Sequence, residues 1–357
     1  ACSHYSRCFV EHSVRKARRA RLVVANHALV MIQAAMGGGD DSSLPTRYVF
    51  DEGHHVFDAA DSAFAAHLSG REMAELRRWL LGNEGTGRRR SSGRARGLRE
   101  RAEDLIAVDD SEAIEALAAA LEAAQVLPAP AWLNRLSGSA PDGAAESFLG
   151  ECRQQVYARA PADHGPYSLE TDVRPPAEEL PGAADELRDA LVALATPLRK
   201  LCARLLRRLD TDADELDSSV RIRIEAVSRA LQRRAEVLLG AWIDMLDGVN
   251  EPASDDFVDW MEIERADGRE IDAGLYRHWV DPTIPFAASM APVAHGMVVT
   301  SATLTDRTGD LEADWNTAET RTGAIHFGKP AIRARVDSPF DYGTQTKVFV
   351  VTDVRRN

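Results

Sequence analysis

The chain has 357 residues, of which 45% are hydrophobic and 28% charged, and its net charge is −13. This length allows two or three domains. The apolar runs are too short for a transmembrane helix, and the acidic balance argues against a uniformly basic nucleic-acid coat. Four cysteines are too few for a disulfide scaffold, so we expect a reducing, cytoplasmic setting. Because the chain starts without Met or a leader-like stretch, we expect a trimmed piece of a longer protein.

The first 66 residues are predicted to be α/β. A basic helical stretch spans residues 15–21, and residues 22–25 and 47–50 are each typical of a short buried strand. The second strand ends in Asp-Glu-Gly-His at residues 51–54. Apolar strands that end in polar residues suit a parallel sheet, whose ligands bind at its carboxyl edge.

From about residue 70 to 250 the pattern is helical. Residues 83–97 predict a mobile loop, and residues 135–185 predict irregular structure because they contain several Pro and Gly. Two long amphipathic helices follow, and the Asp-rich link 210–218 would let them pair as an antiparallel hairpin. Pro197 is expected to kink the first helix. The two apolar stripes, which we interpret as core, consist of Leu187, Leu191, Leu194, Leu198, Leu201 and Leu205, and of Ile224, Val227, Leu231, Ala235, Leu238, Trp242 and Met245.

Strand patterns return after residue 256. Residues 257–263 and 275–280 flank a polar turn and predict a β-hairpin. Residues 297–299 predict a third buried strand, which ends in Thr-Ser-Ala-Thr at residues 300–303. The sequence therefore predicts an α/β layer that is interrupted by a helical insertion and then resumes.

Adjacent acids at a strand end suit nucleotide hydrolysis. The first acid of such a pair, here Asp51, holds Mg²⁺, and the second, Glu52, orients or deprotonates the attacking water. The alternative is a solvated acidic pair. Hydroxyl side chains after the third strand, Ser301 and Thr303, can bond to acids and to His54 on the neighbouring strand, although such clusters also cap turns.

Cysteines and basic clusters carry weaker signals. Cys2 and Cys8 supply two of the four thiolates that a [4Fe–4S] cluster needs, but their spacing alone also fits two ordinary thiols. Cys152 and Cys202 are interpreted as buried thiols. Basic residues that could follow a phosphate backbone, or form a solvated face, are Arg15, Lys16, Arg18, Arg19 and Arg21, then Arg88, Arg89, Arg90, Arg94 and Arg96.

Taken together, these residues resemble the iron–sulfur helicases of superfamily 2, the XPD/DinG-like group. Residues 2–8 resemble the last two cluster cysteines of that family, and residues 22–29 its Asn-His-Ala-Leu segment. Residues 51–55 resemble its DEAH box, residues 300–304 its motif III, and residues 338–342 its Ser-Pro-Phe segment. The matches occur in the family's order at the two ends of the chain.

The resemblance implies a partial RecA-like motor domain with a parallel sheet, interrupted by an all-α arch domain. It divides the chain into the end of the cluster region (1–20), part of motor domain 1 (21–66), the arch (67–250), the remainder of motor domain 1 (251–330) and the start of a linker to motor domain 2 (331–357). The implied activity is ATP-dependent DNA unwinding, in repair or replication, by a monomer that binds single-stranded or forked DNA and no membrane.

The resemblance also implies residue roles. Asp51 would hold Mg²⁺, Glu52 would be the catalytic base for ATP hydrolysis, and His54 would couple hydrolysis to DNA movement together with Ser301 and Thr303. Cys2 and Cys8 would ligate the [4Fe–4S] cluster, and the stretch from Arg15 to Arg21 would contact DNA. The implied cofactors are ATP, Mg²⁺ and the cluster.

Some features depart from the family pattern. Gly53 replaces the usual Ala, which we expect to be sterically harmless. The sequence contains no Gly-x-x-x-x-Gly-Lys-Ser/Thr loop, no further pair of cluster cysteines near its start and no second motor domain. We therefore predict that this chain alone binds ATP poorly, hydrolyses none and holds no intact cluster. The alternatives are a non-catalytic, helicase-derived DNA-binding or scaffolding protein and an unrelated α/β enzyme with a chance acidic pair.

Overall fold

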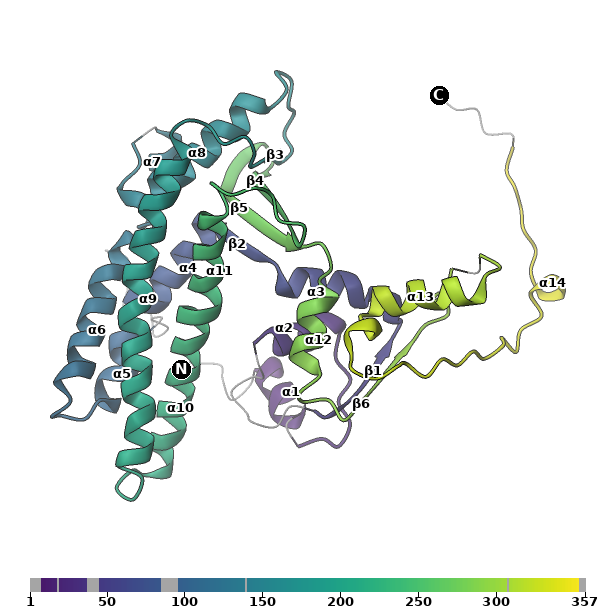
Figure 1. The fold of residues 1–357 in the computed structure, drawn as a ribbon, viewed down its shortest axis with the longest axis horizontal. Helices are drawn as coiled ribbons and strands as arrows, with labels where there is room; N and C mark the ends of the chain where they lie inside the picture. The colour runs from purple at the N-terminus through teal and green to yellow at the C-terminus, as the bar shows by residue number, and fades with distance from the viewer. Residues whose placement is uncertain are drawn as a thin grey trace.

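Two hydrophobic cores organise the protein, which we describe from a computed structural model (Figure 1). The structure describes residues 8–17, 19–36, 45–84, 96–138, 140–306 and 308–352. The larger core lies among long helices and a four-stranded sheet, and the smaller core lies beside a two-stranded sheet. We call these regions the helical part and the small α/β part. Within the described residues, no helix is both long and apolar enough to cross a membrane.

The small α/β part is built from both ends of the chain. Its elements are α1 (Phe9–Ala17), α2 (His27–Ala35), β1 (Arg47–Asp51), η2 (Gly53–His55), α3 (Val56–Phe64), α12 (Thr283–Met290), β6 (Gly296–Thr300), α13 (Leu311–Thr322) and η6 (Ala324–His326). The short helix α14 (Tyr342–Gln345) follows on an extended segment apart from them (Figure 1). Strands β1 and β6 pair in parallel, with Asp51 opposite Thr300. The core beside them contains Met31, Ala34, Phe50, Val56, Ala60, Phe286 and Met290.

The small sheet is covered on one face. Phe50 is buried under α2, α3 and α12, whereas Val49 and Val298, which point to the opposite face, are 72% and 56% exposed. The predicted strands at residues 47–50 and 297–299 are therefore real, but they are half-buried and not fully buried. Residues 22–25 form no strand, and this prediction was wrong. A strand needs a hydrogen-bonding neighbour, and no described segment pairs with this stretch, which leaves Leu22 and Val24 83% and 93% exposed.

The helical part contains most of the chain. Its elements are β2 (Ala66–Ser69), α4 (Gly70–Leu81), α5 (Leu98–Ala102), η3 (Glu103–Leu105), α6 (Ser111–Ala123), η4 (Ala124–Val126), α7 (Trp132–Ser137), α8 (Gly143–Arg159), β3 (Leu169–Asp172), α9 (Leu180–Thr211), α10 (Ser218–Gln232), the π-helical η5 (Arg233–Leu238), α11 (Leu239–Asp247), β4 (Phe257–Ala266) and β5 (Arg269–Trp279). The helix α8 corrects the irregular structure predicted for residues 135–185. The predicted loop at residues 83–97 falls mostly outside the described residues.

The predicted helical hairpin is confirmed. Helix α9 packs against α10 and α11, and these long helices run side by side in Figure 1. All six leucines of the first predicted stripe are buried, and in the second stripe only Val227 and Leu238 are partly exposed. Pro197 lies inside α9. The second helix widens into a π-helical turn at η5, a feature that often marks functional sites.

A four-stranded antiparallel sheet completes the large core. Its strand order is β2-β5-β4-β3, and β4 and β5 confirm the predicted hairpin. Met261, Ile263, Ala273 and Leu275 project from this hairpin into the core that the helices share. The region predicted to be all-α therefore includes strands β2 and β3, and the boundary at residue 250 does not separate the two cores. Antiparallel pairing with β4 and β5 makes strands of segments only four residues long.

Candidate functional site

The end of β1 brings the acidic pair beside the end of β6. Asp51 lies opposite Thr300 in the parallel ladder, so the residues that follow the two strands meet at one edge of the sheet. Glu52 has a left-handed backbone (φ 52°, ψ 49°), which costs a residue with a side chain roughly 1–2 kcal/mol. The chain then enters the short helix η2, which returns His54 toward the same edge.

One hydroxyl group joins the two strand ends. Ser301 Oγ lies 2.8 Å from His54 Nδ1 and donates a hydrogen bond of 3.1 Å to Glu52 Oε2. Thr303 adds its backbone N–H, 3.1 Å from Ser301 Oγ, and its Oγ1, 3.3 Å from His54 Nδ1. The sequence-based expectation that these hydroxyl residues contact the acidic pair and His54 is met for Glu52 and His54, although Glu52 and Ser301 are 249 positions apart in the sequence.

The hydrogen bonds restrict where the protons can lie. A hydroxyl group has one proton, so Ser301 cannot donate to Glu52 and to His54 together. With Ser301 donating to Glu52, its Oγ is free to accept a hydrogen bond from His54 in the tautomer that carries a proton on Nδ1. The result is a directed chain from His54 through Ser301 to Glu52. His54 Nδ1 also lies 3.4 Å from the Glu52 carboxylate.

Gly53 is not interchangeable with Ala at this turn. It is buried, and a Cβ on it would lie 2.1 Å from Val299 Cγ1 on β6. Val has a stiff, branched side chain that cannot rotate away freely. The expectation that Gly53 is sterically harmless was therefore wrong in its implication that Ala would fit equally well. Glycine here permits close contact between η2 and β6.

Asp51 is placed so that its carboxylate could coordinate Mg²⁺ by itself. Its side chain is exposed, and Oδ1 accepts the backbone N–H of Glu52 at 3.1 Å. Among the described residues, no three His, Cys, Asp or Glu side chains converge as a metal cage. Mg²⁺ in nucleotide sites commonly takes only one or two protein carboxylates and completes its shell with water and phosphate oxygens. The exposed carboxylate of Asp51 fits that donor set.

The remaining candidates lie apart from this network. Cys8 is partly buried just before α1, whereas Cys2 and Arg18 lie outside the described residues. Cys152 and Cys202 are buried in the large core as predicted, and burial raises the pKa of both thiols. Exposed residues at and after the end of α1 include Arg15, Lys16, Arg19 and Arg21.

Sequence reasoning missed a second polar cluster. Arg101 and Arg234 lie over the ring of Trp79, and Arg233 lines the same cavity, which also contacts α2. Arg96 also lines this cavity, whereas Arg88, Arg89, Arg90 and Arg94 fall outside the part of the chain that the structure describes. No local motif announces the cluster, because its members come from separate helices. Only the excess of Arg over Lys hinted at such a feature.

Comparison with known proteins gives a partial relationship. No family model matches the chain. Over 78 residues it is 35% identical to the ATP-dependent DNA helicase YoaA of Haemophilus influenzae. The match covers 21% of this chain and 12% of that relative, so the chain corresponds to only a small part of the relative's length. Part of this chain is therefore related to a DNA helicase.

Proposed function

We propose that this chain is part of an ATP-dependent DNA helicase of the iron–sulfur XPD/DinG type. In this proposal, ATP hydrolysis at the end of β1 drives translocation on single-stranded DNA and unwinding of duplexes in repair or replication. The observation that carries the proposal is the hydrogen-bonded chain from His54 through Ser301 to Glu52. The partial similarity to a DNA helicase supports the same function.

The acidic pair divides the chemistry between its members. Asp51 holds Mg²⁺, which supplies charge neutralisation for phosphoryl transfer when it is bound with ATP. Glu52 is the base that orients and deprotonates the attacking water. Its exposed carboxylate has one oxygen held by Ser301 at 3.1 Å, which fixes the direction of the side chain. A held base can receive the proton without first reorienting.

The Ser301 hydroxyl, which joins Glu52 to His54, is suited to coupling ATP hydrolysis to DNA movement. Protonation of Glu52 after water attack removes the charge that Ser301 recognises, so the hydroxyl can turn and the bond to His54 can change with it. Ser301 and Thr303 belong to the segment after β6, while His54 belongs to η2. The network thus transmits the state of Glu52 between two elements that are distant in sequence.

The remaining assignments complete the proposal. Cys2 and Cys8 are two of the four ligands of a [4Fe–4S] cluster. The basic stretch of α1 and the residues after it contacts single-stranded or forked DNA. The arch domain is an insertion in motor domain 1. The helicase is a monomer and is located in the cytoplasm.

The decisive experiment uses the longer parent protein. ATP hydrolysis is measured with and without single-stranded DNA, beside Glu52→Gln and a matched control, Glu178→Gln, which changes an exposed glutamate of the helical part. DNA-stimulated turnover that collapses only in Glu52→Gln supports the motor function. A folded parent that binds DNA but shows no turnover would contradict it and favour a helicase-derived DNA-binding or scaffolding protein.

A further inference from the structure

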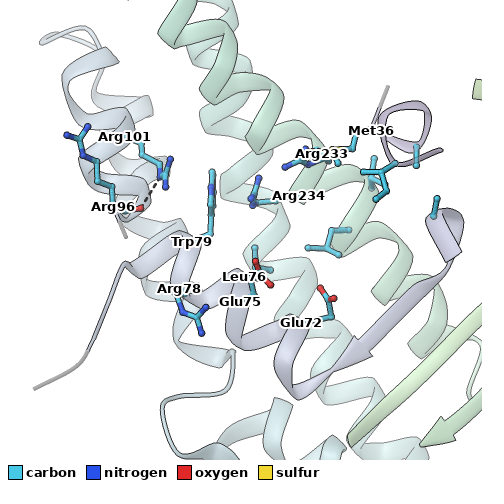
Figure 2. A pocket seen from close by; sticks show the side chains of 15 residues that line it. Met36, Glu72, Glu75, Leu76, Arg78, Trp79, Arg96, Arg101, Arg233 and Arg234 are labelled. Atoms are coloured by element: carbon cyan, nitrogen blue, oxygen red, sulfur yellow. Dashed lines mark hydrogen bonds between the residues drawn. The ribbon is translucent and has the colours of Figure 1, made fainter. Parts of the chain in front are cut away.

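An arginine-rich trough lies between the helical part and α2 of the small α/β part (Figure 2). Its cavity volume is about 510 Å³. Helices α4 and α5, the π-helical η5 and α2 all contribute side chains. Apolar residues that line it include Ile32, Ala35, Leu76, Val237 and Leu238.

The trough has an uncompensated positive charge. Arg78, Arg96, Arg101, Arg233 and Arg234 face only two acidic lining residues, Glu72 and Glu75. Among the described residues, none of these five arginines forms an ion pair with a carboxylate, and two of them, Arg101 and Arg234, are partly buried. Most other buried or partly buried arginines of the helical part do form such a pair. Arg77 with Glu84, Arg135 with Glu146 and Arg153 with Glu270 are examples of such pairs. In a chain of net charge −13, a local group of unpaired arginines marks an anion site.

Trp79 holds two of the guanidinium groups apart. The guanidinium carbon of Arg234 lies 3.8 Å from the Trp79 ring centroid, and that of Arg101 lies 5.8 Å from it. Figure 2 shows the indole between them. Arg101 is further held by the bond from its Nε to the Arg96 carbonyl, at 2.9 Å. Cation–π contact orients both guanidinium groups without neutralising either charge.

Burial makes Arg234 the residue with most to gain from an anion. Desolvation, followed by repulsion from Arg233 and Arg101, lowers the pKa of Arg234 to about 10, against a smaller opposing attraction from Glu75. The side chain is still charged at neutral pH, but it is charged in unfavourable surroundings. A bound anion would offset both causes together.

We propose that this trough binds the phosphate groups of a polyphosphate or of a single-stranded nucleic acid; the nucleic-acid alternative rests on the proposed function, and the polyphosphate alternative does not. Each phosphate presents several oxygens to neighbouring guanidinium forks, and five forks around one cavity exceed what a single carboxylate engages. The cavity volume accommodates more than one phosphate, and its apolar residues provide contact for the ligand's carbon skeleton.

Such a ligand would contact both parts of the molecule. Ile32, Ala35 and Met36 belong to α2 and its end, and Met36 Sδ lies 2.9 Å from a guanidinium nitrogen of Arg233. Phosphate binding at the trough therefore strengthens the contact between α2 and η5. This site is separate from Glu52, so it does not depend on the proposed hydrolysis of ATP.

The test uses the 357-residue chain with two probes, inorganic tripolyphosphate and a fluorescein-labelled oligothymidylate. Dissociation constants are measured at salt concentrations from about 0.05 to 0.3 M. Over this range the logarithm of the binding constant should depend roughly linearly on the logarithm of the salt concentration. The test variant is Arg101→Gln with Arg234→Gln. The control, Arg99→Gln with Arg223→Gln, removes the same charge from α5 and α10 outside the trough, where both arginines pair with exposed acids.

We expect the test variant to weaken binding by about tenfold or more and to lower the salt slope for oligothymidylate by roughly 1.4, about 0.7 for each lost phosphate contact. The control should stay within about twofold of the unmodified chain by the same reasoning. Arg101→Lys with Arg234→Lys keeps the charge but loses the bidentate guanidinium groups. The affinity of this variant should fall between those of the test variant and the unmodified chain. Circular dichroism verifies the fold of each variant.

The two probes distinguish the sources of phosphate. Tripolyphosphate binding that is lost in the test variant supports a free polyphosphate ligand, and loss of oligothymidylate binding alone supports a nucleic-acid strand. Unchanged binding of both probes in the folded test variant would overturn the inference, as would equal competition by a polyglutamate peptide. Both dissociation constants are measured without ATP, so failure of the motor proposal would not be mistaken for failure of this one.

Discussion

The two parts of the molecule differ in how completely they bury their apolar residues. In the helical part, the leucine stripe of α9 is enclosed by α6, α8, α10 and α11. In the small α/β part, the two-stranded sheet is covered on one face only, and Val49 and Val298 remain exposed on the other. The comparison teaches that the candidate chemistry is carried by the less enclosed region, where strand ends leave polar side chains open to a ligand.

The largest expected effect tests the enclosed core. Leu198→Ala removes a fully buried side chain from α9 and should lower the free energy of unfolding by about 2–5 kcal/mol, because the cavity cannot collapse completely. Leu206→Ala, on the exposed side of the same helix, should change it by roughly 0.5 kcal/mol or less. Urea titration measures both. Equal losses in the two variants would show that the stripe is not the packed side.

The second prediction tests close packing in the small part. Gly53→Ala should destabilise the fold by about 1–3 kcal/mol, because the new Cβ would clash with Val299 Cγ1. Adding Val299→Ala should recover part of that loss by making room. Gly296→Ala, whose new Cβ meets no atom within 4 Å, is the control in the same sheet. Thermal unfolding compares the variants, and full stability in Gly53→Ala alone would contradict the close contact.

The third prediction concerns the bridge between the strand ends. Ser301→Ala removes the hydroxyl that joins His54 to Glu52, and in the parent protein it should lower DNA unwinding per ATP hydrolysed by about tenfold, which corresponds to about 1.4 kcal/mol. Ser62→Ala removes a hydroxyl that bonds only within α3 and serves as the control. A strand-displacement assay run beside an ATPase assay gives the ratio. An unchanged ratio in Ser301→Ala would exclude the coupling role.

The smallest expected effect arises where the two parts meet. His67 on β2 stacks with His278 on β5, which lies 2.9 Å from Asp61 on α3. Burial lowers the pKa of His67, and repulsion from His278 adds to this while Asp61 opposes it. The unfolded chain therefore binds a proton more readily than the folded chain, so stability falls as the pH drops below the ordinary value of 6.5.

His67→Gln should remove this part of the acid sensitivity. Urea unfolding between about pH 5 and 8 measures the slope, a range chosen because histidine titrates there. His295→Gln, an exposed histidine beside β6, should leave the slope unchanged. If both variants keep the full slope, His67 is not its source.

Much of the fold was predictable because it is periodic. The stripes of α9 and of α10–α11 repeat every three to four residues, and the alternating β4–β5 hairpin flanks a polar turn. The failures share a cause. Residues 22–25 have the composition of a strand but no pairing partner among the described residues, whereas β2 and β3 are strands because neighbours pair with them.

For the candidate site, the sequence alone determined which residue types stand at the ends of β1 and β6. These residues are Asp51, Glu52, His54, Ser301 and Thr303. Only the tertiary structure decided that one hydroxyl group joins the two ends, that Gly53 packs against Val299, and that separate helices gather arginines around Trp79. The physical reason is distance along the chain. Periodicity is a local property that one segment carries by itself, whereas a contact between residues about 250 positions apart exists only once the whole chain has folded.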